Sequence, residues 1–224
     1  MASDIEICNL GLAHLGDAAD IAALDEGSAQ ADHCARFYPI ARNQLLAMHA
    51  WGFATKREAL ALLDTDELPD TWAYCYTVPS NCIQVISILA PSASTSVFSG
   101  DPYDPLFGEA ARPGDLDAQP YVQEVLQDGS KVIFTNVEDA NIRYVDGITD
   151  PTKFSPLFVT TLARLLASYL AGPVIKGETG MKVAQAQYKA FIQVEFPYAV
   201  AMDQKGQRVN AYKDFIPGGL QARR

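Results

Sequence analysis

The sequence predicts an α+β protein in which the helices come from both ends of the chain and the strands from its middle. Apolar residues recur every three or four positions in residues 1–53 and again in 150–202, which is the helical period. Between these regions, in 54–149, Pro and Gly separate short runs rich in Tyr, Val and Ile. We therefore expect an α-helical bundle, a β-rich insertion and an extended C-terminal tail, residues 203–224.

Length and composition indicate a globular chain that can bury a sizeable core. The 224 residues are 49% hydrophobic and 20% charged. The net charge of −10 disfavours nonspecific binding to nucleic acids or anionic membranes, which requires an excess of basic residues. The N-terminus lacks the basic and apolar regions of a signal peptide, and no uncharged apolar run approaches 18 residues in length. We therefore expect no membrane span.

The predicted helices are bounded by capping residues. A Ser side chain can accept a hydrogen bond from the first helical turn, and Ser3, Ser28 and Ser155 each precede an apolar stripe. Gly tolerates the left-handed backbone that ends many helices, and Gly16 and Gly172 follow such stripes. The predicted helices are residues 3–15, 28–49, 155–172 and 180–200.

The predicted strands depend on alternating apolar residues and on turn signals. The strongest hairpin signal is Asp128-Gly129, because this dipeptide tolerates the positive φ of a tight turn. The segment 91–120 is rich in Pro, Gly, Ser and Asp and has no periodicity, so we expect a long loop or projecting arm there. The predicted strands are residues 71–78, 82–89, 121–126, 131–135 and 141–145.

The cysteines and histidines do not form a metal motif. Cys8, Cys34, Cys75 and Cys82 are scattered, and we expect all four to be reduced, in a protein made in the cytoplasm. His33 is adjacent to Cys34, so on a helix the two side chains would point in different directions. The sequence therefore predicts no metal site and no cofactor.

No stretch of the sequence carries a catalytic motif. Residues 172–179 resemble a phosphate-binding loop, but their lysine precedes the second glycine and the stretch follows a helix, so a helix end is the better interpretation. The acidic residues of 64–70 lack the ligand spacing of a calcium loop. No nucleophile elbow is present. We therefore expect no enzymatic activity.

The stretch from residue 38 to 62 passes from the helical region into the β-rich region. It contains an aromatic turn, Trp51 and Phe53, followed by a basic pair, Lys56 and Arg57. We interpret Trp51 and Phe53 as structural anchors of this joint. The basic pair is too small to indicate nucleic-acid binding, and we expect it to pair with acids of the same or a neighbouring subunit.

Several short motifs follow one another in a fixed order along nearly the whole chain. They are Asn9-Leu10-Gly11, His49 to Ala54 with Lys56-Arg57, Trp72-x-Tyr74-x-Tyr76-x-x-Pro79, Arg143-Tyr144, Phe154-x-Pro156-x-Phe158 and Ala222-Arg223. Their order and spacing together resemble the tail tubular protein A family, the head-to-tail adaptor of short-tailed bacteriophages. Residues 91–120 have no counterpart in this resemblance.

The resemblance implies a structural protein of the virion that assembles as a ring of twelve subunits. Such a ring joins the portal protein to the tail nozzle and forms part of the DNA exit channel, through which DNA passes without specific binding. The β-rich part faces the nozzle, and the C-terminal tail reaches the portal. The portal-binding residues would then be the apolar and basic residues of this tail: Tyr212, Phe215, Ile216, Leu220, Arg223 and Arg224.

Two other functions are also open from the sequence. The first is a head-completion or assembly-chaperone protein that binds a partner but forms no ring. The second is a tail-associated hydrolase that uses acids near Asp101 or Asp115. Glycoside hydrolysis needs two carboxylates held at a fixed separation on rigid elements, and a Pro/Gly-rich arm is a poor scaffold for such a pair.

Overall fold

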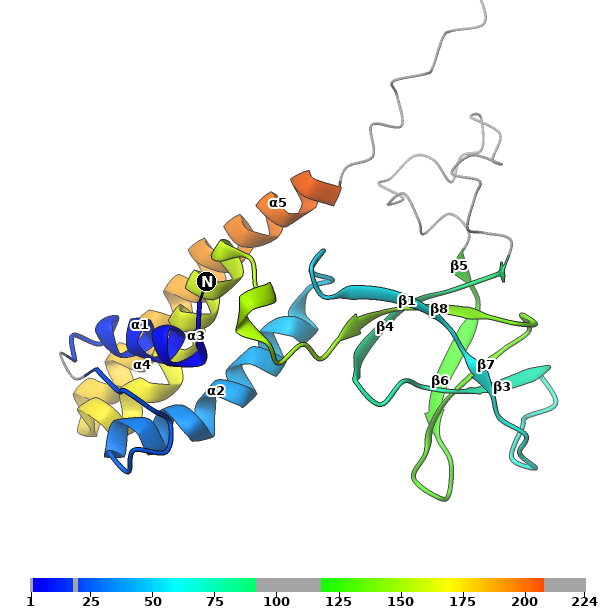
Figure 1. The fold of residues 1–224 in the computed structure, drawn as a ribbon, viewed down its shortest axis with the longest axis horizontal. Helices are drawn as coiled ribbons and strands as arrows, with labels where there is room; N and C mark the ends of the chain where they lie inside the picture. The colour runs from blue at the N-terminus through cyan, green and yellow to red at the C-terminus, as the bar shows by residue number, and fades with distance from the viewer. Residues whose placement is uncertain (1, 18–19, 92–117, 208–224) are drawn as a thin grey trace, which may run out of the picture. The chain divides into compact units, whose positions relative to one another are not determined.

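The computed structural model describes residues 2–17, 20–91 and 118–207, and it confirms the α+β class. Five α-helices and two antiparallel sheets make up its regular structure (Figure 1). The contacts divide the chain into two compact units. The helical unit comprises residues 1–56, 79–86 and 144–204, and the β unit comprises mainly residues 57–78 and 87–143.

The first helix, α1 (Asp4–Ala13), begins and ends as its sequence predicts. Ser3 Oγ accepts a hydrogen bond from the Glu6 N–H at 3.1 Å, and the Ser3 N–H donates to Glu6 Oε2 at 2.9 Å. These two bonds form the predicted capping box and satisfy N–H groups that the first turn leaves free. Gly16 follows with a φ of 75°, the predicted left-handed stop.

The second helix, α2 (Ala29–Met48), starts at the predicted cap. Ser28 Oγ accepts a hydrogen bond from the Ala31 N–H at 3.2 Å. Pro39 lies inside the helix with its ring exposed to solvent. It costs one backbone hydrogen bond but no buried surface, so the helix continues through it.

The third helix, α3 (Pro156–Ile175), also begins at its predicted cap, Ser155, with proline in the first turn. Its predicted end at Gly172 and Pro173 is wrong by about one turn. Pro173 removes a single hydrogen bond, and the Lys176 N–H still donates to the Gly172 carbonyl at 3.0 Å. The helix stops at Lys176, which adopts a φ of 62°.

Helix α3 is long and apolar enough to cross a membrane by length and composition alone, and the expectation of no membrane span stays a prediction. It has 20 residues, and its best 18-residue window has a mean hydropathy of 1.5. The sequence expectation considered only apolar runs without a charged residue, and Arg164 interrupts such a run in α3. In the structure 56% of that window is buried, and α3 packs against α1, α2 and α4. Its apolar surface therefore forms the core of the helical unit.

The last predicted helix is longer than residues 180–200. Helix α4 (Gly177–Ala190) continues through one π-helical turn (Phe191–Glu195) into α5 (Phe196–Gln207), as Figure 1 shows. Pro197 is the second residue after this wide turn. In a regular helix its ring would crowd the carbonyl four residues earlier, and we attribute the wide turn to the relief of that clash.

Gly180, the predicted start of the last helix, lies inside α4. A Cβ at Gly180 would lie 2.9 Å from the Ala171 carbonyl oxygen, so this glycine allows α4 to approach α3 closely. The predicted start of the C-terminal tail, residue 203, is too early, because residues 203–207 belong to α5. Residues 208–224, and most of the predicted loop 91–120, lie outside the described residues.

Within the described residues, eight strands form two four-stranded sheets. The hairpin around Asp128-Gly129 is confirmed, with Val125 opposite Lys131 and a φ of 87° at Gly129. The strands β1, β2 and β5 were not predicted, because they are short or carry charges in place of an alternating apolar pattern. The first sheet has the order β1 (Thr55–Ala59), β8 (Asn141–Asp146), β4 (Cys82–Leu89), β5 (Ala118–Gln119); the second has the order β2 (Ala61–Leu62), β3 (Tyr74–Thr77), β7 (Lys131–Thr135), β6 (Tyr121–Val125).

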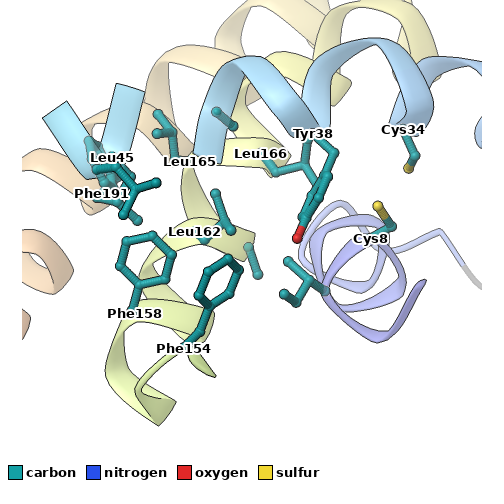
Figure 2. Packing of buried hydrophobic residues seen from close by; sticks show 14 of the residues in the cluster. Cys8, Cys34, Tyr38, Leu45, Phe154, Phe158, Leu162, Leu165, Leu166 and Phe191 are labelled. Carbon is teal, nitrogen blue, oxygen red and sulfur yellow. The ribbon is translucent and has the colours of Figure 1, made fainter. Parts of the chain in front are cut away.

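The core of the helical unit collects aromatic and aliphatic side chains from several helices. In Figure 2, Phe158, Leu162 and Leu166 of α3 lie among side chains from α1, α2 and the π-helical turn. The β unit has a smaller cluster formed by Cys75, Val132 and Phe134 with partly buried neighbours.

Candidate functional site

The predicted anchor Trp51 follows the end of α2 and is completely buried. Its indole N–H donates to the Leu45 carbonyl at 2.8 Å, which satisfies the only polar atom of the side chain. The ring meets Phe158 of α3 edge-on at 5.1 Å between centroids and Phe196 of α5 at 6.4 Å. Trp51 therefore holds the end of α2 against two other helices.

Phe53 extends the same aromatic cluster. Its ring lies 5.0 Å from Phe158 and 5.9 Å from Phe154, both in edge or tilted arrangements that aromatic pairs favour. The structure thus places both aromatic residues of the predicted joint within the helical unit.

Asp203, which joins this cluster from α5, was not predicted from the sequence. Its carboxylate accepts hydrogen bonds from the Gly52 N–H at 3.2 and 3.1 Å. The same carboxylate lies 3.1 Å from His49 Nε2, and both side chains are mostly buried. His49 in turn meets Trp51 edge-on at 5.0 Å. Because more than 150 residues separate Asp203 from its partners, no local pattern could have revealed the contact.

Lys56 and Arg57, the predicted basic pair, have different surroundings in the structure. Lys56 Nζ lies 2.6 Å from Asp146 Oδ2, and the Asp146 side chain is only 7% exposed while that of Lys56 is 52% exposed. The other Asp146 oxygen accepts a hydrogen bond from the Asn81 amide. Lys56 therefore pairs with an acid of its own chain. Arg57 is exposed, and no ion pair is found for it among the described residues.

A second polar cluster lies inside the helical unit, at the π-helical turn. Arg164 of α3 donates from Nε to Glu195 at 2.7 Å and from Nη1 to Gln187 at 2.7 Å. Gln187 donates onward to the His14 carbonyl at 2.9 Å. Burial and the nearby Arg164 charge hold the pKa of the His14 imidazole below its ordinary value. The cluster ties α1, α3 and α4 together.

Apolar side chains are exposed along the continuous helix from α4 to α5. We call this set the α4–α5 apolar face. It consists of Met181, Tyr188 and Ile192, whose spacings of seven and four residues place them on one side of the helix. Their exposed fractions range from 37% for Ile192 to 64% for Met181, and Val194 and Tyr198 are exposed on another side. The β unit also exposes apolar residues, among them Leu62 on β2 and Val125 on β6.

The predicted portal-binding residues are not described by the structure. They are Tyr212, Phe215, Ile216, Leu220, Arg223 and Arg224, all within residues 208–224.

Exposed apolar residues along one helix can be buried by a partner. The polar side chains of the helical unit bind one another: His49 contacts Asp203, and the partly buried Arg164 binds Glu195 and Gln187. Within the described ranges no group of three or more His, Cys, Asp or Glu is placed to hold a metal ion. Comparison of the chain with protein-family models and with curated proteins finds no match.

Proposed function

We propose that this chain is the ring-forming adaptor of a short-tailed bacteriophage, a structural protein that joins the portal to the tail nozzle. The observation that carries this proposal is the α4–α5 apolar face. Apolar surface gathered on one element of a folded protein commonly marks an interface. In the ring, each subunit buries this face against its neighbour. The ordered series of motifs that resembles the adaptor family supports the same function.

The finer architecture belongs to the same proposal: an α-helical bundle from both chain ends with an inserted β-rich domain. It is supported by the composition of the helical unit, which draws on residues 1–56 and 144–204. Much of the intervening chain, residues 57–78 and 87–143, forms the β unit. An insertion of this kind lets one part of the subunit form the ring while the other contacts a different partner.

The proposal assigns a partner to each part of the chain. The C-terminal tail binds the portal protein, and the β unit binds the nozzle protein. The channel of the ring conducts the genome without holding it. The net charge of −10 supports this last role, because a protein without basic excess forms few contacts with DNA phosphates.

The test is a measurement of assembly by mass photometry on the full-length protein, alone and with portal protein. Wild type should form a ring of twelve with the portal. Met181→Asp places a charge in the α4–α5 apolar face and should leave a monomer, because burying an unpaired carboxylate is costly. Val125→Asp is the matched control: Val125 is 62% exposed and Met181 64%. It should still assemble.

Circular dichroism of both variants must match wild type, so that loss of assembly is not loss of folding. If wild type stays monomeric with the portal, the ring is excluded and a head-completion or chaperone-like binding protein is favoured. If Val125→Asp disrupts the ring as strongly as Met181→Asp, the α4–α5 apolar face is not the subunit interface.

A second experiment tests the C-terminal tail. Truncation should begin after Gln207, not at residue 203, because Asp203 holds Gly52 and His49 within the helical unit. The truncated protein should keep its circular dichroism spectrum and thermal midpoint but lose binding to the portal. Full portal binding by the truncated protein would exclude the tail as the portal contact.

A further inference from the structure

Two cysteines of the helical unit face each other where α1 meets α2. Cys8 lies on α1 and Cys34 on α2, and both are completely buried. Figure 2 shows the two side chains pointing toward each other, with their sulfur atoms between the two helices. Both are free thiols, and they share a side-chain hydrogen bond. The chain thus places two thiols in contact although 26 positions separate them in sequence.

The two thiols differ in acidity. The hydrogen bond from Cys8 stabilises the Cys34 thiolate and lowers the pKa of Cys34. The same hydrogen bond, together with burial, raises the pKa of Cys8. Since the thiolate is the reactive form of cysteine, either thiol can begin the reaction once it is deprotonated, and this hydrogen bond favours the order that starts at Cys34.

We propose that Cys8 and Cys34 are a site of oxidative modification, at which a small-molecule disulfide such as oxidised glutathione converts the two thiols into a disulfide that links α1 to α2. The inference rests on the side-chain geometry of one subunit. It does not depend on ring formation or on the proposed function.

The reaction needs no other reagent. The Cys34 thiolate attacks one sulfur of the small disulfide, which forms a mixed disulfide and releases one thiolate. The Cys8 sulfur, as its proton leaves, then attacks the Cys34 sulfur of the mixed disulfide and releases the second thiolate. The two protein thiols are oxidised, the small disulfide is reduced to two thiols, and the protons lost by Cys8 and Cys34 pass to the two released thiolates.

Burial sets the rate of this reaction. Because both sulfur atoms are shielded from solvent, the reagent reaches Cys34 only when α1 or the start of α2 opens locally. We therefore expect slow oxidation that is accelerated by low concentrations of denaturant. Once formed, the link restricts the unfolded chain between the two helices and stabilises the folded helical unit.

The remaining cysteines supply internal controls. Cys75 is buried on β3 in the β unit. Cys82 is partly exposed at the start of β4. We expect Cys82 to react first, as the most accessible thiol, and to carry glutathione as a mixed disulfide.

The test treats the full-length protein with oxidised glutathione, blocks the remaining thiols with an alkylating agent in denaturant, and maps the peptides by mass spectrometry without reduction. We expect one linked pair of peptides that contains Cys8 and Cys34. The linked protein should unfold at a midpoint about 5 to 10 °C higher than the reduced protein, and a reducing agent should reverse the shift. Cys75→Ala should behave as wild type.

Cys8→Ala and Cys34→Ala should each lose both the linked peptide and the thermal shift. Peptide mapping of the wild type decides the matter even if one variant folds poorly. A map in which Cys8 and Cys34 stay alkylated while Cys82 carries glutathione would overturn the proposal, and so would a link that joins either residue to Cys75 or Cys82. A linked protein with an unchanged or lower midpoint would overturn the stabilising role.

Discussion

The helical unit and the β unit differ in how many side chains they bury. The helical unit has a large core in which Trp51, Phe158 and Phe191 are completely buried. Among the described residues the β unit buries fewer side chains: one cluster contains Cys75, Val132 and Phe134, and residues such as Ile88, Ile133 and Ile142 are completely buried as well. Antiparallel backbone ladders, such as that between β6 and β7, also join its strands. The helical unit therefore has the larger described core, while strand pairing links the elements of the β unit.

This difference bears on function. In the helical unit most of the large apolar side chains described as exposed lie along α4 to α5, and Ile40 on α2 is a further one. Such a unit can present a defined surface to a neighbouring subunit. In the β unit the exposed valines lie on β6, at the edge of its sheet. Sheet edges can recruit another chain through backbone groups.

The largest effect should come from Trp51→Ala in the core of the helical unit. Removing this buried ring leaves a cavity between α2, α3 and α5, and we expect a loss of about 3–5 kcal/mol in the free energy of unfolding. Urea unfolding followed by far-ultraviolet circular dichroism measures it. The chain has only two tryptophans, Trp51 and Trp72, so the fluorescence of this variant reports the β unit through Trp72.

The contrast between the units predicts two different curves for Trp51→Ala. The helical signal should move to lower urea, and the Trp72 fluorescence should move less. The matched control is Trp72→Ala: Trp72 is only partly buried against the β-unit cluster, so its truncation should cost less. Equal shifts of both signals would show that the units unfold as one, and the contrast would fail.

A smaller effect should be a difference in the free energy of unfolding between Lys56→Ala and Arg57→Ala. Lys56→Ala leaves the buried Asp146 carboxylate with Asn81 but without its cation, and we expect a loss of about 1–2 kcal/mol. Arg57→Ala should change stability by less than about 0.5 kcal/mol, because it removes an exposed side chain. Thermal or urea unfolding of both variants checks the difference. Equal losses would mean that the Lys56–Asp146 pair contributes little.

The smallest effect should be a pH dependence confined to the helical unit. The pKa of His14 is below its ordinary value of 6.5 in the folded protein, so at lower pH the unfolded chain binds a proton that the folded chain does not. This contribution to stability is complete above about pH 6.5 and is lost as the pH falls below it. His14→Gln should therefore lose less stability than wild type between about pH 7.5 and 5.5.

Urea unfolding at the two pH values, followed by circular dichroism, measures this difference. His14→Gln keeps the backbone carbonyl that accepts from Gln187, so the hydrogen bond between α1 and α4 is preserved. An identical loss in both proteins would assign the pH dependence to other groups.

Local signals were read correctly where a few neighbouring residues determine the structure. The Ser3 capping box, the left-handed Gly16 and the Asp128-Gly129 hairpin each depend on backbone geometry within a few positions, which the sequence determines directly. The predicted helix boundaries were wrong where contacts between distant residues override the local preference. Helix α3 continues past Pro173, and α5 continues past the residue at which the tail was expected.

The candidate site shows the same division. The sequence by itself identified Trp51, Phe53 and Lys56 as unusual, because their aromatic and basic character stands out at the end of an apolar helix. Only the tertiary structure supplied their partners: Asp203 and Asp146 lie far away in sequence and match no motif. Likewise, only the tertiary structure determined that Cys8 and Cys34 meet and that Met181, Tyr188 and Ile192 remain exposed. Periodicity specifies which face of a helix is apolar, but the packing of all elements together determines which apolar side chains are buried and which are left for a partner.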